Sequence, residues 1–217
     1  MFKLNKKEIP EFFISAKKNV KIPLVSSAWN DTNIRNISFK LREHILLQEQ
    51  ELLCCYCETE IDSSSDTSNI DHFKTRHLFP RLTLEYDNLL ISCNTRYQCS
   101  SFKDDKIKYK SDYDNIINPV IEDPDYYFDY LLTGDIFPKS NIDAKSKEKA
   151  IFTIAIFQLN NTRLVHKRKE VARSLSYLQQ QYNQPKLSTL YNHFPDFKSF
   201  VKNIYSKIFQ QPKQKPH

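Results

Sequence analysis

Four of the five cysteines have the spacing of a metal site. Cys54 and Cys57 have two residues between them, which lets both thiolates of a tight turn reach one Zn²⁺. Cys93 and Cys99 follow after 35 residues, with five residues between them. Two such pairs complete a closed, tetrahedral zinc site that stabilises the fold and does no chemistry. The alternative is free cysteines in the core. We expect Cys55, whose one-residue spacing from Cys57 makes a poorer chelate, to be buried.

The dipeptide Asp71-His72 lies between the two cysteine pairs. Hydrolysis of a phosphodiester bond requires a base for the attacking water and a Lewis acid for the phosphate charge. A neutral imidazole is a suitable base near pH 7, and a carboxylate binds hard divalent cations such as Mg²⁺. Successive residues of a strand point to opposite faces, so the two side chains would address different atoms. A hydrogen-bonded surface histidine is the alternative, but the flanking cysteines favour the catalytic interpretation.

Basic side chains follow this dipeptide and recur late in the chain. They suit contacts with phosphate groups, because each neutralised phosphate releases counterions. A solvated loop or a solvated helix face is the alternative. The candidates for binding nucleic acid are Lys74, Arg76, Arg81, Lys103, Arg163, Lys167 and Arg168.

The apolar pattern predicts the elements that position these residues. A short helix over residues 9–19 precedes a stronger one over 31–51, whose apolar residues recur at helical spacing and which leads into Cys54. Residues 68–73 read as a strand, and 82–86 with 89–92 as a second strand or extended segment. A polar helix over 98–108 completes the unit. The order strand, loop, strand, helix places the cysteines and Asp71-His72 on a ββα unit.

The remainder of the chain is predicted to be a hairpin followed by helices. The aromatic run of residues 126–132, then Gly134 and residues 136–137, reads as the hairpin. Helices are predicted over residues 142–159, 162–182 and 197–209, and a disordered tail over 210–217. We therefore divide the chain into an N-terminal helical segment (1–53), a core (54–110), a hairpin with a basic helical region (111–209) and the tail.

Composition and charge limit the classes of function. The chain has 217 residues, 40% apolar and 27% charged, which is ordinary for a globular protein. Residues 1–138 carry 17 Lys+Arg against 22 Asp+Glu, whereas residues 139–217 carry 15 against 4. The basic C-terminal region suits either phosphate contact or a solvated helix face. Gly134 is the only glycine, which excludes ATP binding through a Gly-rich phosphate loop.

The chain has no signal for a membrane or for export. No apolar run approaches the roughly 18 residues that a membrane span needs. The N-terminal residues lack the apolar segment and cleavage site of a signal peptide. We expect a cytoplasmic protein that has no membrane partner and whose clustered cysteines bind metal rather than form disulfides.

These motifs together resemble a known family. The pattern Cys-x-x-Cys, Asp-His, Asn-Leu-Leu, Cys, then Cys-x-x-x-Lys resembles HNH (ββα-metal) endonucleases. The stretches IDHFKTR, LEYDNLLISC, NPVIEDPDYYFDYLLTGDIFP and LNNTRLVHKR resemble more closely the PtuB-like HNH nuclease subunit of Septu-type anti-phage systems. The resemblance covers most of the chain from Trp29 to about Arg173, and its specific portion is residues 54–106.

The resemblance implies a fold, an activity and partners. The fold would be α+β and mostly α, with a ββα-metal core and a four-cysteine zinc site between N-terminal and C-terminal helices. The activity would be divalent-metal phosphodiesterase, with structural Zn²⁺ and catalytic Mg²⁺ or Mn²⁺. The partners would be a PtuA-like ATPase, a DNA or RNA substrate (tRNA included) and, in some systems, a retron reverse transcriptase with its msDNA.

The family roles transfer to individual residues by position. His72 would be the general base, Asp71 a ligand of the catalytic metal, and Asn88 the residue that braces the loop around the histidine. Cys54, Cys57, Cys93 and Cys99 would bind zinc. The family commonly has Asn after the last cysteine as a metal ligand, but this chain has Ser100. Either Ser100 binds the metal through water or Asp104, one turn later, replaces it. The departure also leaves a second interpretation open, a zinc-stapled module that binds nucleic acid or a partner through a decayed nuclease site.

Overall fold

Two antiparallel strands and one helix contain most of the motif residues. In the computed structural model, which describes residues 1–181 and 185–209, strand β1 (Ser68–His72) pairs with strand β2 (Leu89–Cys93). The register sets Asp71 opposite Leu90 and His72 opposite Leu89. Helix α3 (Cys99–Lys106) follows and packs on β2. The predicted order of strand, strand and helix is therefore present.

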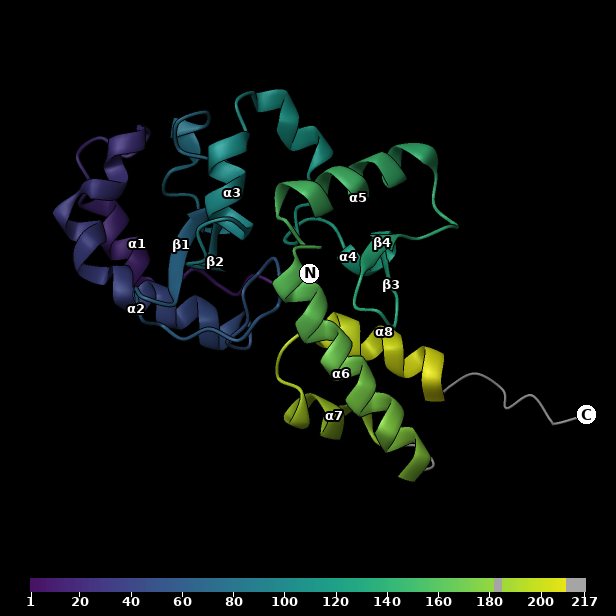
Figure 1. Ribbon diagram of the computed structural model, residues 1–217. Helices are drawn as coiled ribbons and strands as arrows, with labels where there is room; N and C mark the ends of the chain where they lie inside the picture. The colour runs from purple at the N-terminus through teal and green to yellow at the C-terminus, as the bar shows by residue number, and fades with distance from the viewer. Residues whose placement is uncertain (182–184, 210–217) are drawn as a thin grey trace, which may run out of the picture.

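The N-terminal helices lie against this unit (Figure 1). Helix α1 (Glu11–Lys18) packs on α2 (Thr32–Gln48), and the 3-10 helix η1 (Ser26–Asn30) connects them. Asp31 caps α2, because its carboxylate accepts a hydrogen bond of 2.9 Å from the backbone N–H of Asn33. The apolar positions of α2 are buried at helical spacing, which confirms the predicted amphipathic helix, and α2 packs on β2.

The second half of the chain begins with a small hairpin. The 3-10 helix η4 (Lys110–Asn115) and the single-turn helix α4 (Pro124–Tyr127) precede strands β3 (Phe128–Tyr130) and β4 (Ile136–Pro138), which pair antiparallel. Gly134 in the turn has φ of 95°, and a Cβ there would lie 2.2 Å from the carbonyl oxygen of Val165. The turn needs glycine because of both its φ angle and its close approach to a helix.

Four helices complete the described chain (Figure 1). Helix α5 (Ala144–Ile156) packs on α3 and β4, and α6 (Thr162–Gln181) packs on α8 (Lys198–Phe209). A short helix, α7 (Leu187–His193), lies between α6 and α8 in the sequence and packs on α8. About half of the chain is helical and the two sheets are small, so the fold is α+β.

Some predicted elements differ from those observed. Residues 82–86 were expected to be extended, but the 3-10 helices η2 (Pro80–Leu82) and η3 (Tyr86–Asn88) occupy this region and β2 begins at Leu89. Pro80 fixes its own φ and lacks an N–H donor, which favours a turn over a strand. Helix α7 was not predicted. The tail 210–217 and the end of the predicted helix at Tyr182 lie outside the described residues.

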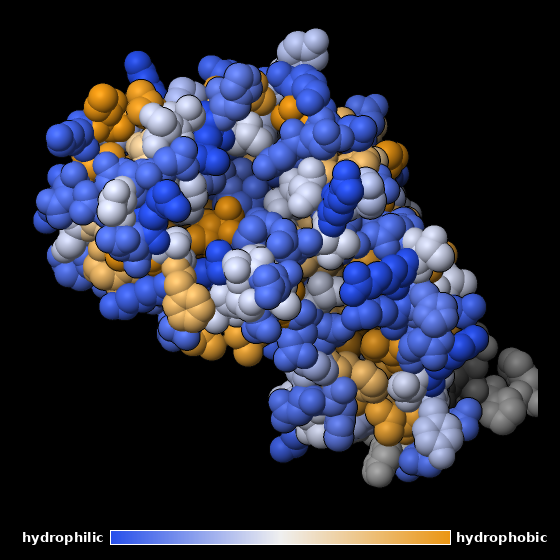
Figure 2. Space-filling view, turned by 60° about the vertical axis from the view of Figure 1, so that its left-hand side comes forward, coloured by the Kyte–Doolittle hydropathy of each residue, from blue (hydrophilic) through white to orange (hydrophobic). Residues whose placement is uncertain are grey.

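One hydrophobic core joins the predicted segments. It contains Phe13 and Ile45 from the N-terminal helices, Ile91 from β2, and Phe157 and Phe200 from the C-terminal region. The division of the chain into four segments stays a prediction. Hydrophilic side chains cover much of the face shown in Figure 2, with hydrophobic ones in smaller patches. No helix among residues 1–181 and 185–209 has the length and apolar character needed to cross a membrane.

Candidate metal centre and candidate active site

Four cysteines from three separate segments meet in the core. Cys54 and Cys57 lie in the turn after α2, Cys93 ends β2, and Cys99 begins α3. All four are buried, and their sulfur atoms lie within 4.8 Å of one another. The Sγ atoms of Cys54 and Cys99 are 3.8 Å apart, and those of Cys57 and Cys93 are 3.9 Å apart.

These distances fit a tetrahedral zinc site. Four thiolates about 2.3 Å from a central Zn²⁺ have their sulfur atoms about 3.8 Å apart. The four thiols can therefore hold a metal ion such as Zn²⁺, as the spacing predicted. Within the described residues, no other group of three or more His, Cys, Asp or Glu side chains is arranged to hold a metal. Cys55 is buried beside the cluster but is not one of its four members.

Polar groups from distant segments surround the sulfur atoms. The side-chain amide of Gln98 donates to Cys93 Sγ at 3.4 Å and to Cys57 Sγ at 3.8 Å. The Gln98 carbonyl oxygen accepts a hydrogen bond of 2.7 Å from Asn161, which also caps α6 through the N–H of Leu164. Donors of this kind stabilise thiolate ligands, and this set connects the metal centre to the first turn of α6.

The imidazole of His72 is held in one orientation at the end of β1. Its Nε2 lies 2.9 Å from the carbonyl oxygen of Thr83, so Nε2 carries the hydrogen and donates it. Trp29 packs edge-on against the ring with centroids 4.6 Å apart. Burial, with smaller contributions from the charges of Arg76 and Lys103, lowers the pKa of His72 to about 4. At pH 7 the ring is neutral, and Nδ1 has the free lone pair of a base.

Asn88 braces the loop that follows His72. Its carbonyl oxygen accepts a hydrogen bond of 2.8 Å from the N–H of Lys74. Its amide donates to the carbonyl oxygens of Lys74 and Leu82 at 3.0 and 3.1 Å. These contacts join the two sides of the loop between β1 and β2, and a role of Asn88 in catalysis stays a prediction.

Asp71 points to the opposite face from His72 and is already paired. The Lys103 ammonium donates to its two carboxylate oxygens at 3.0 and 2.9 Å, and the hydroxyl of Tyr56 also donates to Oδ2. Asp71 and Lys103 are 3% and 0% exposed, so water does not compete for either charge. Burial acts to lower the pKa of Lys103, but the charges of Asp71 and Asp104 outweigh it and raise this pKa.

Of the other two predicted ligands of the catalytic metal, Ser100 does not contact Asp71, and Asp104 meets it only through the ammonium of Lys103. Ser100 is buried, and its hydroxyl lies 3.3 Å from the side-chain oxygen of Asn69. Asp104 contacts Lys103 at 3.1 Å, and its side chain is 52% exposed. Partial burial of its carboxyl and the nearby charge of Asp71 raise the pKa of Asp104 to about 6. As arranged here, Asp71, Ser100 and Asp104 do not fit a divalent ion.

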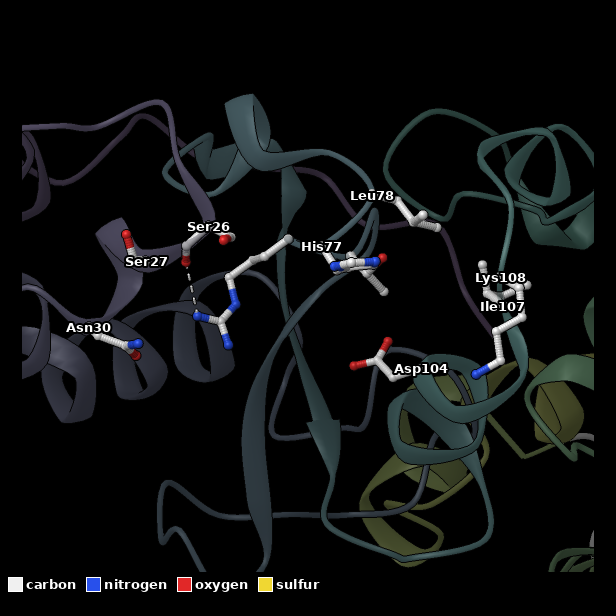
Figure 3. A pocket seen from close by; sticks show the side chains of 10 residues that line it. Ser26, Ser27, Asn30, His77, Leu78, Asp104, Ile107 and Lys108 are labelled. Atoms are coloured by element: carbon white, nitrogen blue, oxygen red, sulfur yellow. Dashed lines mark hydrogen bonds between the residues drawn. The ribbon is translucent and has the colours of Figure 1, made fainter.

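A cavity of about 640 Å³ lies beside the end of α3 (Figure 3). Ser26, Ser27 and Asn30 from η1 line one side of it, and Asp104 and Lys108 line the other. The loop after β1 contributes four further lining residues, Thr75, Arg76, His77 and Leu78. The Arg76 guanidinium donates to the carbonyl oxygen of Ser26 at 3.3 Å, so it connects the loop to η1. The wall of the cavity is polar and has two cations, Arg76 and Lys108, and one carboxylate, Asp104.

Two residues predicted to contact nucleic acid are buried. Lys103 is enclosed as described above, and Arg168 is 3% exposed with its guanidinium bonded to the carbonyl oxygens of Gly134 and Leu159. Because both charges are used inside the protein, neither side chain is available to a phosphate group in this structure. Of the others, Arg76 lines the cavity, Lys74 and Lys167 are partly buried, and Arg81 and Arg163 are exposed. No residue of α6 lines the cavity.

Several site residues had no signal in the sequence. Trp29 packs on the predicted base. Tyr56 lies inside the Cys-x-x-Cys turn, yet its hydroxyl reaches Asp71 while its ring stacks on Phe157 at 3.9 Å. Gln98 and Asn161 are separated by 62 residues in the sequence and meet only after folding. The one signal in the sequence that could have identified Gln98 is its position directly before Cys99.

The fold and the site define an α+β protein that has a buried four-cysteine cluster able to hold a metal ion, and a polar cavity next to the end of α3. No family model matches the chain. Part of it is similar to the Septu protein PtuB of Bacillus thuringiensis, with 31% identity over 102 residues. That stretch is 45% of this chain and 37% of that relative, so the chain covers less than half of the relative's length.

Proposed function

We propose that this chain is the effector subunit of a Septu-type anti-phage system and hydrolyses phosphodiester bonds in nucleic acid. The similarity to PtuB supports the defence role. The orientation of His72 supports the chemistry, because Nε2 is fixed on Thr83 and leaves a neutral Nδ1 as the base. In this proposal Nδ1 takes a proton from water, and the water oxygen attacks phosphorus. The bond from phosphorus to the leaving oxygen breaks with its electron pair on that oxygen, which then takes a proton from solvent.

The cavity next to this loop suits the phosphate group of a substrate. Arg76 and Lys108 supply positive charge at its wall, and Ser27 and Asn30 supply neutral hydrogen-bonding groups. No step of the proposal passes through a divalent ion, because Asp71 is paired with Lys103. Dependence of cleavage on Mg²⁺ or Mn²⁺ stays a prediction, as do the PtuA-like ATPase, the retron partners and the cytoplasmic location.

The experiment maps broken nucleic acid in cells. The chain is induced together with a PtuA-like ATPase, and the ends of broken DNA and RNA are sequenced for the native protein and for His72→Gln. Glutamine keeps a donor for Thr83 but has no basic nitrogen. We expect His72→Gln to lower cleavage roughly 100- to 10,000-fold, the usual contribution of a general base. His193→Gln, at an exposed histidine that does not line the cavity, is the matched control.

Retention of full cleavage by His72→Gln would refute the assignment of the base. Addition of chelator, Mg²⁺ or Mn²⁺ to the purified complex tests the metal dependence. The same assay separates DNA from RNA as substrate.

A binding module without nuclease activity is the second candidate. The pairing of Asp71 with Lys103 and the burial of Ser100 favour it, since both remove ligands from the predicted catalytic metal. It predicts a stable zinc-containing complex with the ATPase that produces no breaks in any nucleic acid, with or without Mg²⁺ or Mn²⁺.

A further inference from the structure

The Lys103 ammonium lies inside a cage of oxygen atoms. It contacts Asp71 Oδ1 at 3.0 Å, Asp71 Oδ2 at 2.9 Å and the carbonyl oxygens of His72 and Phe73 at 2.8 and 3.0 Å. Asp104 Oδ1 is the fifth oxygen, at 3.1 Å. Five oxygen atoms from two carboxylates and two carbonyls thus surround a single positive charge, and the lysine side chain is 0% exposed.

Hard metal ions use the same set of donors. Carboxylate and backbone carbonyl oxygens are the usual ligands of Mg²⁺ and Ca²⁺, at about 2.0 to 2.6 Å. In this protein the oxygens point at a nitrogen, at hydrogen-bond distances. A divalent ion at Asp71 would lie next to an ammonium that has no route to water, and the two like charges would repel each other. The hydroxyl of Tyr56 further occupies Asp71 Oδ2.

The cage has one member at the surface. The side chain of Asp104 is half exposed and lines the cavity beside α3 (Figure 3). If the lysine charge were absent, an ion entering from the cavity would reach Asp104 first. It would then reach Asp71 and the carbonyl oxygens of His72 and Phe73, which do not line the cavity. Asp104 is therefore the member of the cage at which a solvent ion would enter once the lysine charge is removed.

We propose that Lys103 is the resident cation of this cage and excludes divalent metal ions from Asp71 and Asp104. The inference goes beyond the proposed function and holds whether or not the chain cleaves nucleic acid. It predicts that the folded, zinc-loaded native protein has no Mn²⁺ site that depends on Asp71, and that removing the ammonium creates one.

The test measures Mn²⁺ binding by the loss of its free electron paramagnetic resonance signal. The zinc-loaded full chain is titrated as the native protein, as Lys103→Met and as the double variant Asp71→Asn with Lys103→Met. Methionine is unbranched and fills the buried channel without a charge. We expect Lys103→Met to bind one Mn²⁺ at least about tenfold more tightly than the native chain. The double variant, which lacks both charges of the pair, should bind as weakly as the native chain.

Lys103→Met leaves a buried carboxylate unpaired and is expected to fold less stably than the native chain. The unfolding temperature with and without Mn²⁺ is therefore a second measurement. Mn²⁺ should raise the unfolding temperature of Lys103→Met and leave those of the native chain and the double variant unchanged. Tight Mn²⁺ binding by the native chain that is lost in Asp71→Asn would overturn the proposal whatever the state of the other variants. Failure of Mn²⁺ to bind or stabilise Lys103→Met would also contradict it. Neither readout depends on cleavage, so the proposed nuclease function fails or survives separately.

Discussion

Two adjacent residues of β1 have opposite environments. Asp71 faces Lys103 of α3 and Tyr56 of the turn after α2, which together satisfy its carboxylate. His72 faces Trp29 and Thr83, where its ring is neutral. The alternation of side chains along a strand produces this separation. The charge of Asp71 is thus paired with Lys103 and hydrogen-bonded to Tyr56, whereas the ring of His72, the predicted base, is uncharged.

The depressed pKa of His72 predicts how stability depends on pH. The folded chain takes up this proton near pH 4, and the unfolded chain takes it up near the ordinary pKa of 6.5. Between these values the unfolded state binds more protons, so the free energy of unfolding falls as the pH is lowered from 6.5 to 4. The loss should reach roughly 3 kcal/mol, at about 1.4 kcal/mol for each pH unit. Above pH 6.5 this contribution is constant.

Denaturant titrations at several pH values check the prediction. His72→Gln has no proton to take up, so its free energy of unfolding should fall less than that of the native protein over the same window. Equal pH dependence in the two proteins would show that the ring is not buried in its neutral form.

At the scale of elements, the four-cysteine cluster brings three segments together. The turn after α2, the end of β2 and the start of α3 each supply cysteine, and Gln98 with Asn161 adds the first turn of α6. Zinc binding to such a site contributes directly to folding, because the ligands are not preassembled in the unfolded chain. The contact of Gly134 with α6 fixes the hairpin against the same helix.

The amide of Gln98 is expected to tune zinc affinity. Gln98→Leu removes the N–H groups that point at the sulfur atoms, and loss of such an outer contact typically lowers metal affinity about 10- to 100-fold. Asn161→Asp keeps the oxygen that caps α6 but loses the donor to Gln98, so it should have a smaller effect in the same direction. Competition with a chromophoric chelator measures both. Unchanged affinity in Gln98→Leu would exclude a role for the amide.

At the scale of the whole molecule, charge is divided between the two halves of the sequence. Residues 139–217 contain 15 Lys+Arg and only 4 Asp+Glu. The cavity lies in the other half of the sequence, among η1, the loop after β1 and α3. Part of the basic charge is used internally, as by Arg168, so only the remainder can act on a partner. Arg163, near the start of α6, is exposed.

Charge reversal at Arg163 tests whether α6 binds nucleic acid. If it contacts a phosphate, Arg163→Glu should weaken binding across all sequences and lower the slope of log affinity against log salt by about 1. Lys18→Glu makes the same change at an exposed position of α1 and should leave the slope as it is. Binding to fluorescent DNA and RNA at several salt concentrations provides the measurement. Equal slopes for the native protein and Arg163→Glu would remove α6 from the nucleic-acid surface.

Local signals were sufficient for much of the fold. The spacing of Ile34, Leu41 and Ile45 determined the helix of residues 32–48, because an apolar stripe at helical period must be buried on one face. The spacing of the cysteines predicted which four sulfur atoms meet. Two cysteines separated by two residues can bind one metal ion from a single tight turn, and a second pair completes the four ligands. The ββα order followed from the same pattern.

Only the tertiary structure decided the state of the site. The sequence placed Asp71 with the metal ligands and Lys103 with the phosphate contacts, yet the two side chains meet each other in the core. Their pairing depends on how α3 packs against β1, and no local pattern reports the distance between residues 32 positions apart. The neutral state of His72 has the same origin, because burial by Trp29 and the loop at Thr83 is a property of the folded chain. Sequence thus determined which groups are present, and packing determined which charges remain free to act.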